Sequence, residues 1–258
     1  MHPVLEVCVD STASALAAKR GGADRLELCA DLIIGGTTPS TALLRQVKQL
    51  TGLPVRALLR PRFGDFCYDS YELAQMEQLA AELVQAGADG IVTGVLTPEG
   101  VLDADALRPI YAAARRAAVQ AGRPVACTLH RAFDVCRDPF AALETAEELG
   151  LCTILTSGQA ASAPQGAPLL QKLVKQADGK IEILVGAGVS AQNIPALAAQ
   201  TGAKAFHLSG KQVLDSRMTF RRKGVPMGLP GFSEFEIWQT SAENIRAARQ
   251  ALDRLEIG

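Results

Sequence analysis

Two stretches near the start of the chain, Leu5-Glu6-Val7-Cys8-Val9-Asp10 and Arg25-Leu26-Glu27-Leu28-Cys29, alternate aliphatic side chains with polar or thiol side chains. Successive side chains of a strand point to opposite faces, so the aliphatic residues of both stretches share one face. The other face carries Glu6, Cys8, Arg25, Glu27 and Cys29. Both faces of an open doubly wound sheet are covered by helices and are near-continuously apolar. A polar face therefore favours the interior of a closed barrel over the open sheet.

Short strand patterns of this kind alternate with longer Ala-rich helical patterns along the rest of the chain. The sequence predicts strands at residues 5–9, 25–29, 55–60, 90–94, 125–130, 153–157, 182–186 and 205–209. It predicts helices near residues 12–20, 40–51, 70–86, 104–120, 139–149, 166–177, 191–200 and 242–255. Because alternating units form parallel sheets and right-handed crossovers close eight of them, we expect an α/β fold, a (β/α)8 TIM-type barrel.

We expect this barrel to be a single domain over residues 1–258, because no domain boundary is visible in the sequence. A long loop at about 210–240 precedes the last predicted helix and contains Gly, Pro and a basic cluster. That loop is compatible with a lid over the barrel mouth, an oligomer contact or a surface excursion.

The composition excludes several classes of protein. The 258 residues (27.2 kDa) are 48% hydrophobic, which excludes a disordered chain. With 26 basic and 27 acidic residues the net charge is −1, so we expect no nucleic-acid partner and no anionic membrane surface. No signal-peptide pattern and no apolar run of about 18 residues occur. Six cysteines in such a chain indicate reduced thiols and a cytoplasmic protein.

Cys8 and Cys29 lie near the ends of two strands that we expect to be neighbours. Neighbouring strands are about 4.8 Å apart, so the two sulfurs could share one ion. Paired thiolates select Cu(I), or Zn²⁺ if nitrogen or oxygen ligands join them. The alternative is that both cysteines are small residues filling the upper layer of the barrel.

Charged residues fall near strand interiors or ends at Glu6, Arg25, Glu27, Arg56, Arg60 and His130, and just beyond at Arg62 and Asp65. An unpaired buried charge is very costly, so we expect a paired network. The network either fixes the strand register or forms a polar pocket for an anionic ligand. In the second case Arg60, Arg62 or Arg131 would hold a carboxylate or phosphate.

The segment His130-Arg131-Ala132-Phe133-Asp134 ends the fifth predicted strand with an imidazole. Asp134 could orient His130 or Arg131, and a histidine held in this way can act as a general base or a metal ligand. The alternative is a core histidine whose hydrogen bonds are all satisfied. His207, inside the eighth predicted strand, has the same two interpretations.

Glycines follow the last two predicted strands, at Gly186, Gly188 and Gly210, the last directly after Ser209. In barrels these two loops often form a phosphate cradle from backbone N–H groups. Glycines are also common in loops of any kind, so the pattern alone does not separate the two explanations.

Longer strings resemble the copper homeostasis protein CutC family over nearly the whole chain. They include residues 5–11, 22–29, 35–40, 60–62, 64–66, 92–94, 130–134, 155–159 and 186–189. The resemblance implies a cytoplasmic TIM-type barrel, often a homo-oligomer, associated with copper tolerance or Cu(I) binding. In that family the proposed copper ligands are the cysteines that end the first two strands, which correspond to Cys8 and Cys29 here.

Two functions follow as hypotheses. The first is a cytoplasmic copper homeostasis protein that binds Cu(I) through Cys8 and Cys29 at the barrel mouth. The second is an enzyme for a small phosphorylated or carboxylated metabolite, with Glu27 and His130 as acid and base. Its ligand-binding residues would be Arg60, Arg62, Asp65, Arg131, Gly186, Gly188, Ser209 and Gly210. The partner is thus a metal ion or a small anionic ligand, together with further copies of the chain.

Overall fold

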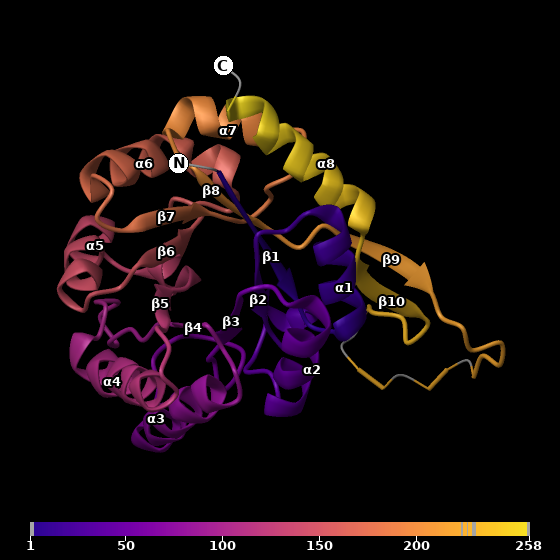
Figure 1. Ribbon diagram of the computed structural model, residues 1–258, viewed down its shortest axis with the longest axis horizontal. Coiled ribbons are helices and arrows are strands. Elements are labelled where there is room, and N and C mark those ends of the chain that lie inside the picture. The colour runs from indigo at the N-terminus through magenta and orange to yellow at the C-terminus, as the bar shows by residue number, and fades with distance from the viewer. Residues whose placement is uncertain (1–2, 223, 226, 229–230, 257–258) are drawn as a thin grey trace.

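The computed structural model describes residues 3–222, 224–225, 227–228 and 231–256. Eight parallel strands form a closed barrel in chain order, with the last strand paired to the first. They are β1 (Val4–Val9), β2 (Arg25–Leu28), β3 (Val55–Leu58), β4 (Gly90–Thr93), β5 (Ala126–Leu129), β6 (Thr153–Thr156), β7 (Glu182–Val185) and β8 (Ala205–Leu208). The helices surround this ring on the outside (Figure 1). The structure confirms the predicted (β/α)8 barrel.

The outer helices are α1 (Thr12–Gly21), α2 (Thr41–Thr51), α3 (Ser70–Gln85), α4 (Ala104–Gln120), α5 (Pro139–Glu148), α6 (Ala163–Ala177), α7 (Ile194–Thr201) and α8 (Ala242–Asp253). Side-chain oxygens of the preceding residue accept a backbone N–H at the start of several helices, for example Ser11, Ser40 and Ser241. Three short 3₁₀ helices are also present, η1 (Leu32–Ile34), η2 (Arg131–Val135) and η3 (Arg254–Glu256). The predicted helices match this order, with α6 beginning three residues earlier and α7 three residues later than expected.

The two faces of the barrel strands have different partners. Leu5, Val7 and Val9 are fully buried in the main apolar core, which the outward face of the barrel shares with the helices. The opposite face of β1 and its neighbours points into the barrel and carries the polar residues, as the alternation predicts. Two small apolar clusters, Cys29–Leu58–Val92 and Leu155–Leu184–Ala205, are separate from the main core and lie on these inward positions.

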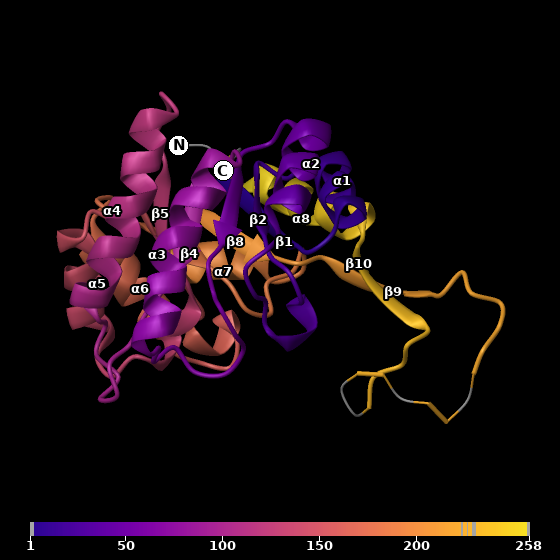
Figure 2. The same cartoon turned by 90° about the horizontal axis from the view of Figure 1, so that it is seen from below.

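The segment expected as a long loop at about 210–240 contains two strands. β9 (Lys211–Asp215) pairs antiparallel with β10 (Glu236–Thr240), and the hairpin extends away from the barrel (Figure 2). The loop expectation missed this hairpin because neither strand has a clear alternation of apolar and polar residues. We call the described residues of this segment, 211–222, 224–225, 227–228 and 231–240, the arm; the other positions between 211 and 240 lie outside the described residues.

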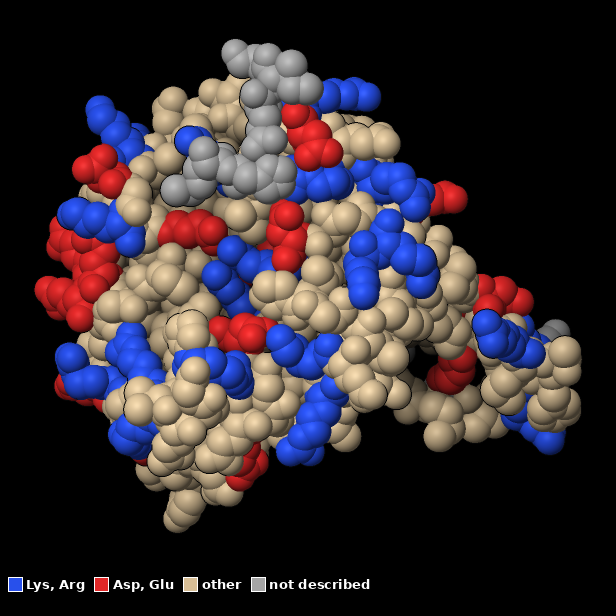
Figure 3. Space-filling model, in the orientation of Figure 1, with Lys and Arg blue, Asp and Glu red and all other residues tan. Residues whose placement is uncertain are grey.

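The surface agrees with the nearly neutral composition. Lysine and arginine side chains are interspersed with aspartate and glutamate over the face of the molecule seen in Figure 3. Within the described residues, no helix has the length and apolar character needed to cross a bilayer.

Candidate functional site

A network of ion pairs fills the barrel below its carboxyl-end mouth. Arg25 Nε lies 2.6 Å from Glu6 Oε2, and Arg25 Nη2 lies 2.5 Å from Glu182 Oε1. Arg56 Nη1 lies 3.8 Å from the same oxygen of Glu6 and donates to the hydroxyls of Thr128 (3.0 Å) and Thr153 (2.9 Å). The buried charges are therefore paired across the barrel, as the cost of burying them predicts.

Glu6 is the centre of this network and is 1% exposed. Burial alone would raise the pKa of its carboxyl, but the hydrogen bond from His207 and the charges of Arg25, His207 and Arg56 lower it to about 2. Glu6 is thus a fixed carboxylate that holds neighbouring cations.

His207 joins the network to the mouth of the barrel. Its Nδ1 lies 2.9 Å from Glu6 Oε1, and its Nε2 lies 3.7 Å from Glu27 Oε2. Burial would lower the pKa of His207, but Cys8, Glu6 and Glu27 raise it well above its ordinary value. The two carboxyl groups therefore favour the protonated form of the His207 ring.

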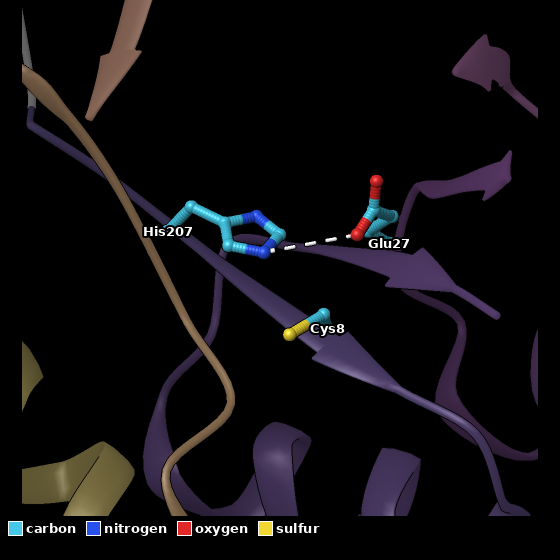
Figure 4. A group of neighbouring side chains, drawn as sticks. All are labelled: Cys8, Glu27 and His207. Atoms are coloured by element: carbon cyan, nitrogen blue, oxygen red, sulfur yellow. Dashed lines mark ion pairs between the residues drawn. The ribbon is translucent and has the colours of Figure 1, made fainter. Parts of the chain in front are cut away.

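Cys8, Glu27 and His207 bring their ligand atoms together at this point. The three donor atoms, one from each residue, all lie within 4.8 Å of one another (Figure 4). They come from β1, β2 and β8, which are adjacent in the closed barrel. Sulfur, nitrogen and oxygen donors at this spacing form a candidate metal centre.

Cys29 lies beside this group. Its thiol donates to Glu27 Oε2 at 3.6 Å, and burial together with the Glu27 charge raises its pKa well above the ordinary value. Burial also raises the pKa of Glu27, with the charge of His207 opposing the rise and that of Glu6 adding to it. Cys8 and Cys29 both line one cavity of about 170 Å³ at the mouth. Neither cysteine is turned outward beneath the helices.

His130, proposed from the sequence as a base, directly follows β5 and lines the same cavity. Its Nδ1 accepts a hydrogen bond from the backbone N–H of Ala132 (3.2 Å). Burial and the charge of Arg60 lower its pKa to about 3, so the ring is neutral and Nε2 carries the proton. This arrangement favours a hydrogen-bond donor over a proton acceptor.

Arg60 also lines the cavity, whereas Arg62 and Asp65 are not among its lining residues. Arg62 is engaged elsewhere, with Nε 2.6 Å from Glu72 Oε1 and Nη1 3.0 Å from Asp65 Oδ1. Arg131 lies at the cavity edge and pairs with Asp134 at 2.7 Å. Asp134 thus orients Arg131, one of the two alternatives left open by the sequence.

The loops after β7 and β8 line a larger cavity of about 770 Å³. Gly188, Ser209 and Gly210 are among its lining residues, beside Cys8 and His207. Gly186 has a packing role, because a Cβ atom there would lie 2.6 Å from Cδ1 of Leu155. The predicted glycine loops therefore do border a hollow at the mouth.

His207 is the site residue whose partners the sequence left undetermined. It lies 201 residues from Glu6, and only the pairing of β8 with β1 brings the two side by side. The sequence contained one indication of its position. His207 lies two residues after Ala205 on the eighth strand, so the two side chains point to the same, inward face of the barrel.

Comparison with known proteins gives one consistent result. The model of the CutC family matches residues 3–212. A CutC family protein of Chromobacterium violaceum is 44% identical over 254 residues, covering 98% of this chain and 100% of that protein. The human copper homeostasis protein cutC homolog is 42% identical over 244 residues, covering 94% of this chain and 86% of its own length.

Solved structures agree. The crystal structure of CutC from Streptococcus agalactiae superposes with a TM-score of 0.74 at 29% identity, covering 80% of this chain and 98% of that one. A 3-keto-L-gulonate-6-phosphate decarboxylase from Vibrio cholerae superposes with a TM-score of 0.57 at 13% identity, over 98% of this chain and 99% of that one. At that identity the second likeness shows the shared barrel fold alone.

Proposed function

Because the chain belongs to the CutC family, we propose that it is a copper homeostasis protein that binds Cu(I) at the barrel mouth and buffers or transfers it in the cytoplasm. The observation that carries this proposal is the convergence of Cys8 and His207 with Glu27, beside the second thiol of Cys29.

The donor chemistry suits Cu(I). Thiolates and imidazole nitrogens are the ligands that a soft monovalent copper ion prefers, and hard cations such as Mg²⁺ and Ca²⁺ need more oxygen atoms than this group offers. We assign Cys8 and Cys29 as the thiolate ligands and His207 Nε2 as a nitrogen ligand. Glu27 contacts both Cys29 and His207, and we assign it the role of positioning these two ligands.

The surroundings of the proposed Cu(I) ligands suit reversible binding of the ion. Metal binding releases the protons of Cys29 and His207, which both stay protonated in the metal-free protein. Leu58 and Leu155 line the same cavity as the two thiols, of which Cys29 is buried and Cys8 partly exposed. Protons compete with Cu(I) for these ligands, so the affinity for Cu(I) depends on pH and the ion can be released as well as bound.

Competition with a Cu(I) chelator such as bicinchoninate tests the proposal. We expect Cys8→Ser and His207→Asn each to weaken Cu(I) binding at least tenfold. Cys152→Ser provides the matched control, because Cys152 is an exposed thiol on β6's amino-terminal side, away from the mouth. Loss of affinity in the control equal to that in Cys8→Ser would contradict the assignment.

We also propose that the protein forms a homo-oligomer through the arm. The arm exposes large apolar side chains on a hairpin that extends from the barrel (Figure 2). These side chains include Val213, Met218, Phe220 and Ile237. Several exposed apolar side chains on one projecting element are typical of protein–protein contacts, and a second copy presents the same side chains.

A further inference from the structure

We propose that the cavity at the barrel mouth also binds a small organic carboxylate with an adjacent carbonyl oxygen, a 2-oxo acid, through Arg60 and His130. The inference goes beyond copper binding, since neither residue belongs to the Cys8–Glu27–His207 group. It rests on a cavity, on two buried hydrogen-bond donors with no partner, and on a buried positive charge with no counter-ion.

The counter-ion is missing at Arg60, which is 8% exposed. Its Nη1 donates to the carbonyls of Gly35 and Gly36, both at 3.2 Å, and its Nη2 donates to the carbonyl of Gly64 at 2.8 Å. No carboxylate among the described residues lies within 4.0 Å of the guanidinium. Arg25, Arg62 and Arg131 each pair with a carboxylate. A ligand with a negative charge would compensate Arg60.

Among the described residues, four buried side-chain atoms have no hydrogen-bond partner: Arg60 Nε, His130 Nε2, the Tyr68 hydroxyl and Arg249 Nη2. Only Arg60 and His130 among these four residues line the cavity at the mouth. Nδ1 of His130 accepts from Ala132, so Nε2 carries the hydrogen of the neutral ring and can only donate. Buried donors are almost always satisfied in native proteins, so an oxygen atom of a bound molecule is the expected partner.

The aromatic ring of Phe66 packs against both Arg60 and His130, and all three residues line the same cavity. The guanidinium carbon of Arg60 lies 4.9 Å from the centre of this ring, and the imidazole of His130 lies 4.8 Å from it. Because Arg60 and His130 line one small cavity, one molecule can contact both side chains. Its carboxylate would face the charged Arg60, and its neutral carbonyl oxygen would face the neutral His130.

The cavity limits the size and character of this molecule. Its volume of about 170 Å³ is below the roughly 300–1,000 Å³ of pockets for drug-sized ligands, so a compound of a few carbon atoms fits. Leu32, Leu58 and Leu155 contribute apolar walls that suit a short carbon chain. This lining favours an organic acid over inorganic phosphate.

Calorimetric titration of the metal-free, full-length protein with pyruvate tests the proposal. We expect saturable binding of pyruvate and at least tenfold weaker binding of pyruvamide, which lacks the carboxylate. Arg60→Lys should weaken pyruvate binding at least tenfold, because lysine has no donor at the position of the unpartnered Nε. Arg115→Lys is the matched control, since Arg115 also binds loop carbonyls, those of Leu149 and Gly150, and should stay within twofold of the wild type.

Two variants of His130 separate its donor from its structural role. His130→Asn can keep the acceptor for the Ala132 N–H but removes the donor at the Nε2 position, so pyruvate affinity should fall about tenfold while acetate affinity changes little. His130→Gln places an amide N–H near that position and should retain most of the affinity. Circular dichroism establishes that each variant is folded before it is titrated.

Absence of pyruvate binding at 10 mM to the folded wild type would overturn the proposal, as would equal losses in Arg60→Lys and Arg115→Lys. Cu(I) affinity, measured in the same variants, distinguishes the copper proposal from the 2-oxo acid proposal. We expect Arg60→Lys to retain Cu(I) binding, because Arg60 is not part of the Cys8–Glu27–His207 group. A wild type that binds pyruvate but no Cu(I) therefore contradicts the copper proposal alone, and a wild type that binds Cu(I) but no pyruvate contradicts this one alone.

Discussion

Nδ1 of His207 lies 2.9 Å from Oε1 of Glu6, a carboxylate that is itself bound to Arg25. This contact uses one ring nitrogen of His207 and leaves the other, Nε2, facing Glu27. In metal sites a carboxylate on the non-ligating nitrogen fixes the orientation and the tautomer of the histidine. Glu6 is therefore placed to position His207 without touching the cargo itself.

Removing the charge of this contact should weaken copper binding. Glu6→Gln keeps an oxygen near Nδ1 but loses the negative charge, and we expect Cu(I) affinity to fall about tenfold. In a Glu6→Gln, His207→Asn double variant the losses should not add, because both changes act on one ligand. Chelator competition measures all three proteins, and fully additive losses would show that Glu6 acts independently of His207.

Removing a charge from an ion pair inside the barrel should lower the free energy of unfolding more than removing one from a surface ion pair. Arg25→Met leaves Glu6 and Glu182 without their closest cation, and we expect it to lower the free energy of unfolding by about 3–5 kcal/mol. Arg116→Met removes an exposed partner of Glu77 and should cost less than about 1 kcal/mol. Urea unfolding measures both. Similar costs for the two variants would show that the buried network contributes no more than a surface pair.

His130 should make stability depend on pH. Burial and the charge of Arg60 lower its folded-state pKa to about 3, while the unfolded chain takes up the proton near pH 6.5. Between these values the unfolded state binds more protons, so the free energy of unfolding falls as the pH falls, by up to about 1.4 kcal/mol per pH unit. Above pH 6.5 this contribution is constant.

The His130→Gln variant isolates that contribution. Urea unfolding of wild type and variant between pH 4.5 and 7.5 gives a difference in stability, in which the contributions of Glu6 and His207 cancel. We expect the difference to change with pH below 6.5 in favour of the variant. A difference that is flat over the whole range would mean that the folded protein protonates His130 as readily as the unfolded chain.

The arm should control the oligomeric state. Replacing Met218 and Phe220, both exposed, by serine should convert the oligomer to smaller species in light scattering at about 50 µM. Tyr71→Ser on α3 is the control, because Tyr71 is an equally prominent exposed side chain on the barrel. A monomeric wild type under these conditions would contradict the proposed oligomer. A double variant with the same mass as the wild type would show that the arm is not part of the interface.

Local sequence patterns were sufficient to predict the barrel. Alternation in β1 and β2 placed Glu6, Cys8, Glu27 and Cys29 on the inward face. The last three line the cavity at the mouth, and Glu6 contacts His207, which lines the same cavity. The pattern works because a strand has a fixed period of two, and a parallel barrel gives each face a different environment. Helix positions followed from the same strand–helix spacing and from capping residues.

Contacts that depend on closure of the barrel could not be predicted from local sequence patterns. The stagger between β8 and β1 sets which residue faces Glu6, and no local pattern encodes that register for His207. The separation of Arg60 from Arg62 depends on side-chain direction at the end of β3 and on hydrogen bonds to two loops. The arm was missed because its strands are stabilised by pairing with each other and have no buried face.

Measurement of Cu(I) stoichiometry and affinity in the Cys8→Ser, Cys29→Ser double variant tests the central proposal most directly. The Cys67→Ser, Cys152→Ser double variant removes the same number of thiols away from the group at the mouth. We predict that the wild type and this control bind one Cu(I) ion with equal affinity, and that the first variant binds none in competition with bicinchoninate. Full affinity in the Cys8→Ser, Cys29→Ser protein would contradict the assignment of the barrel mouth as the copper site.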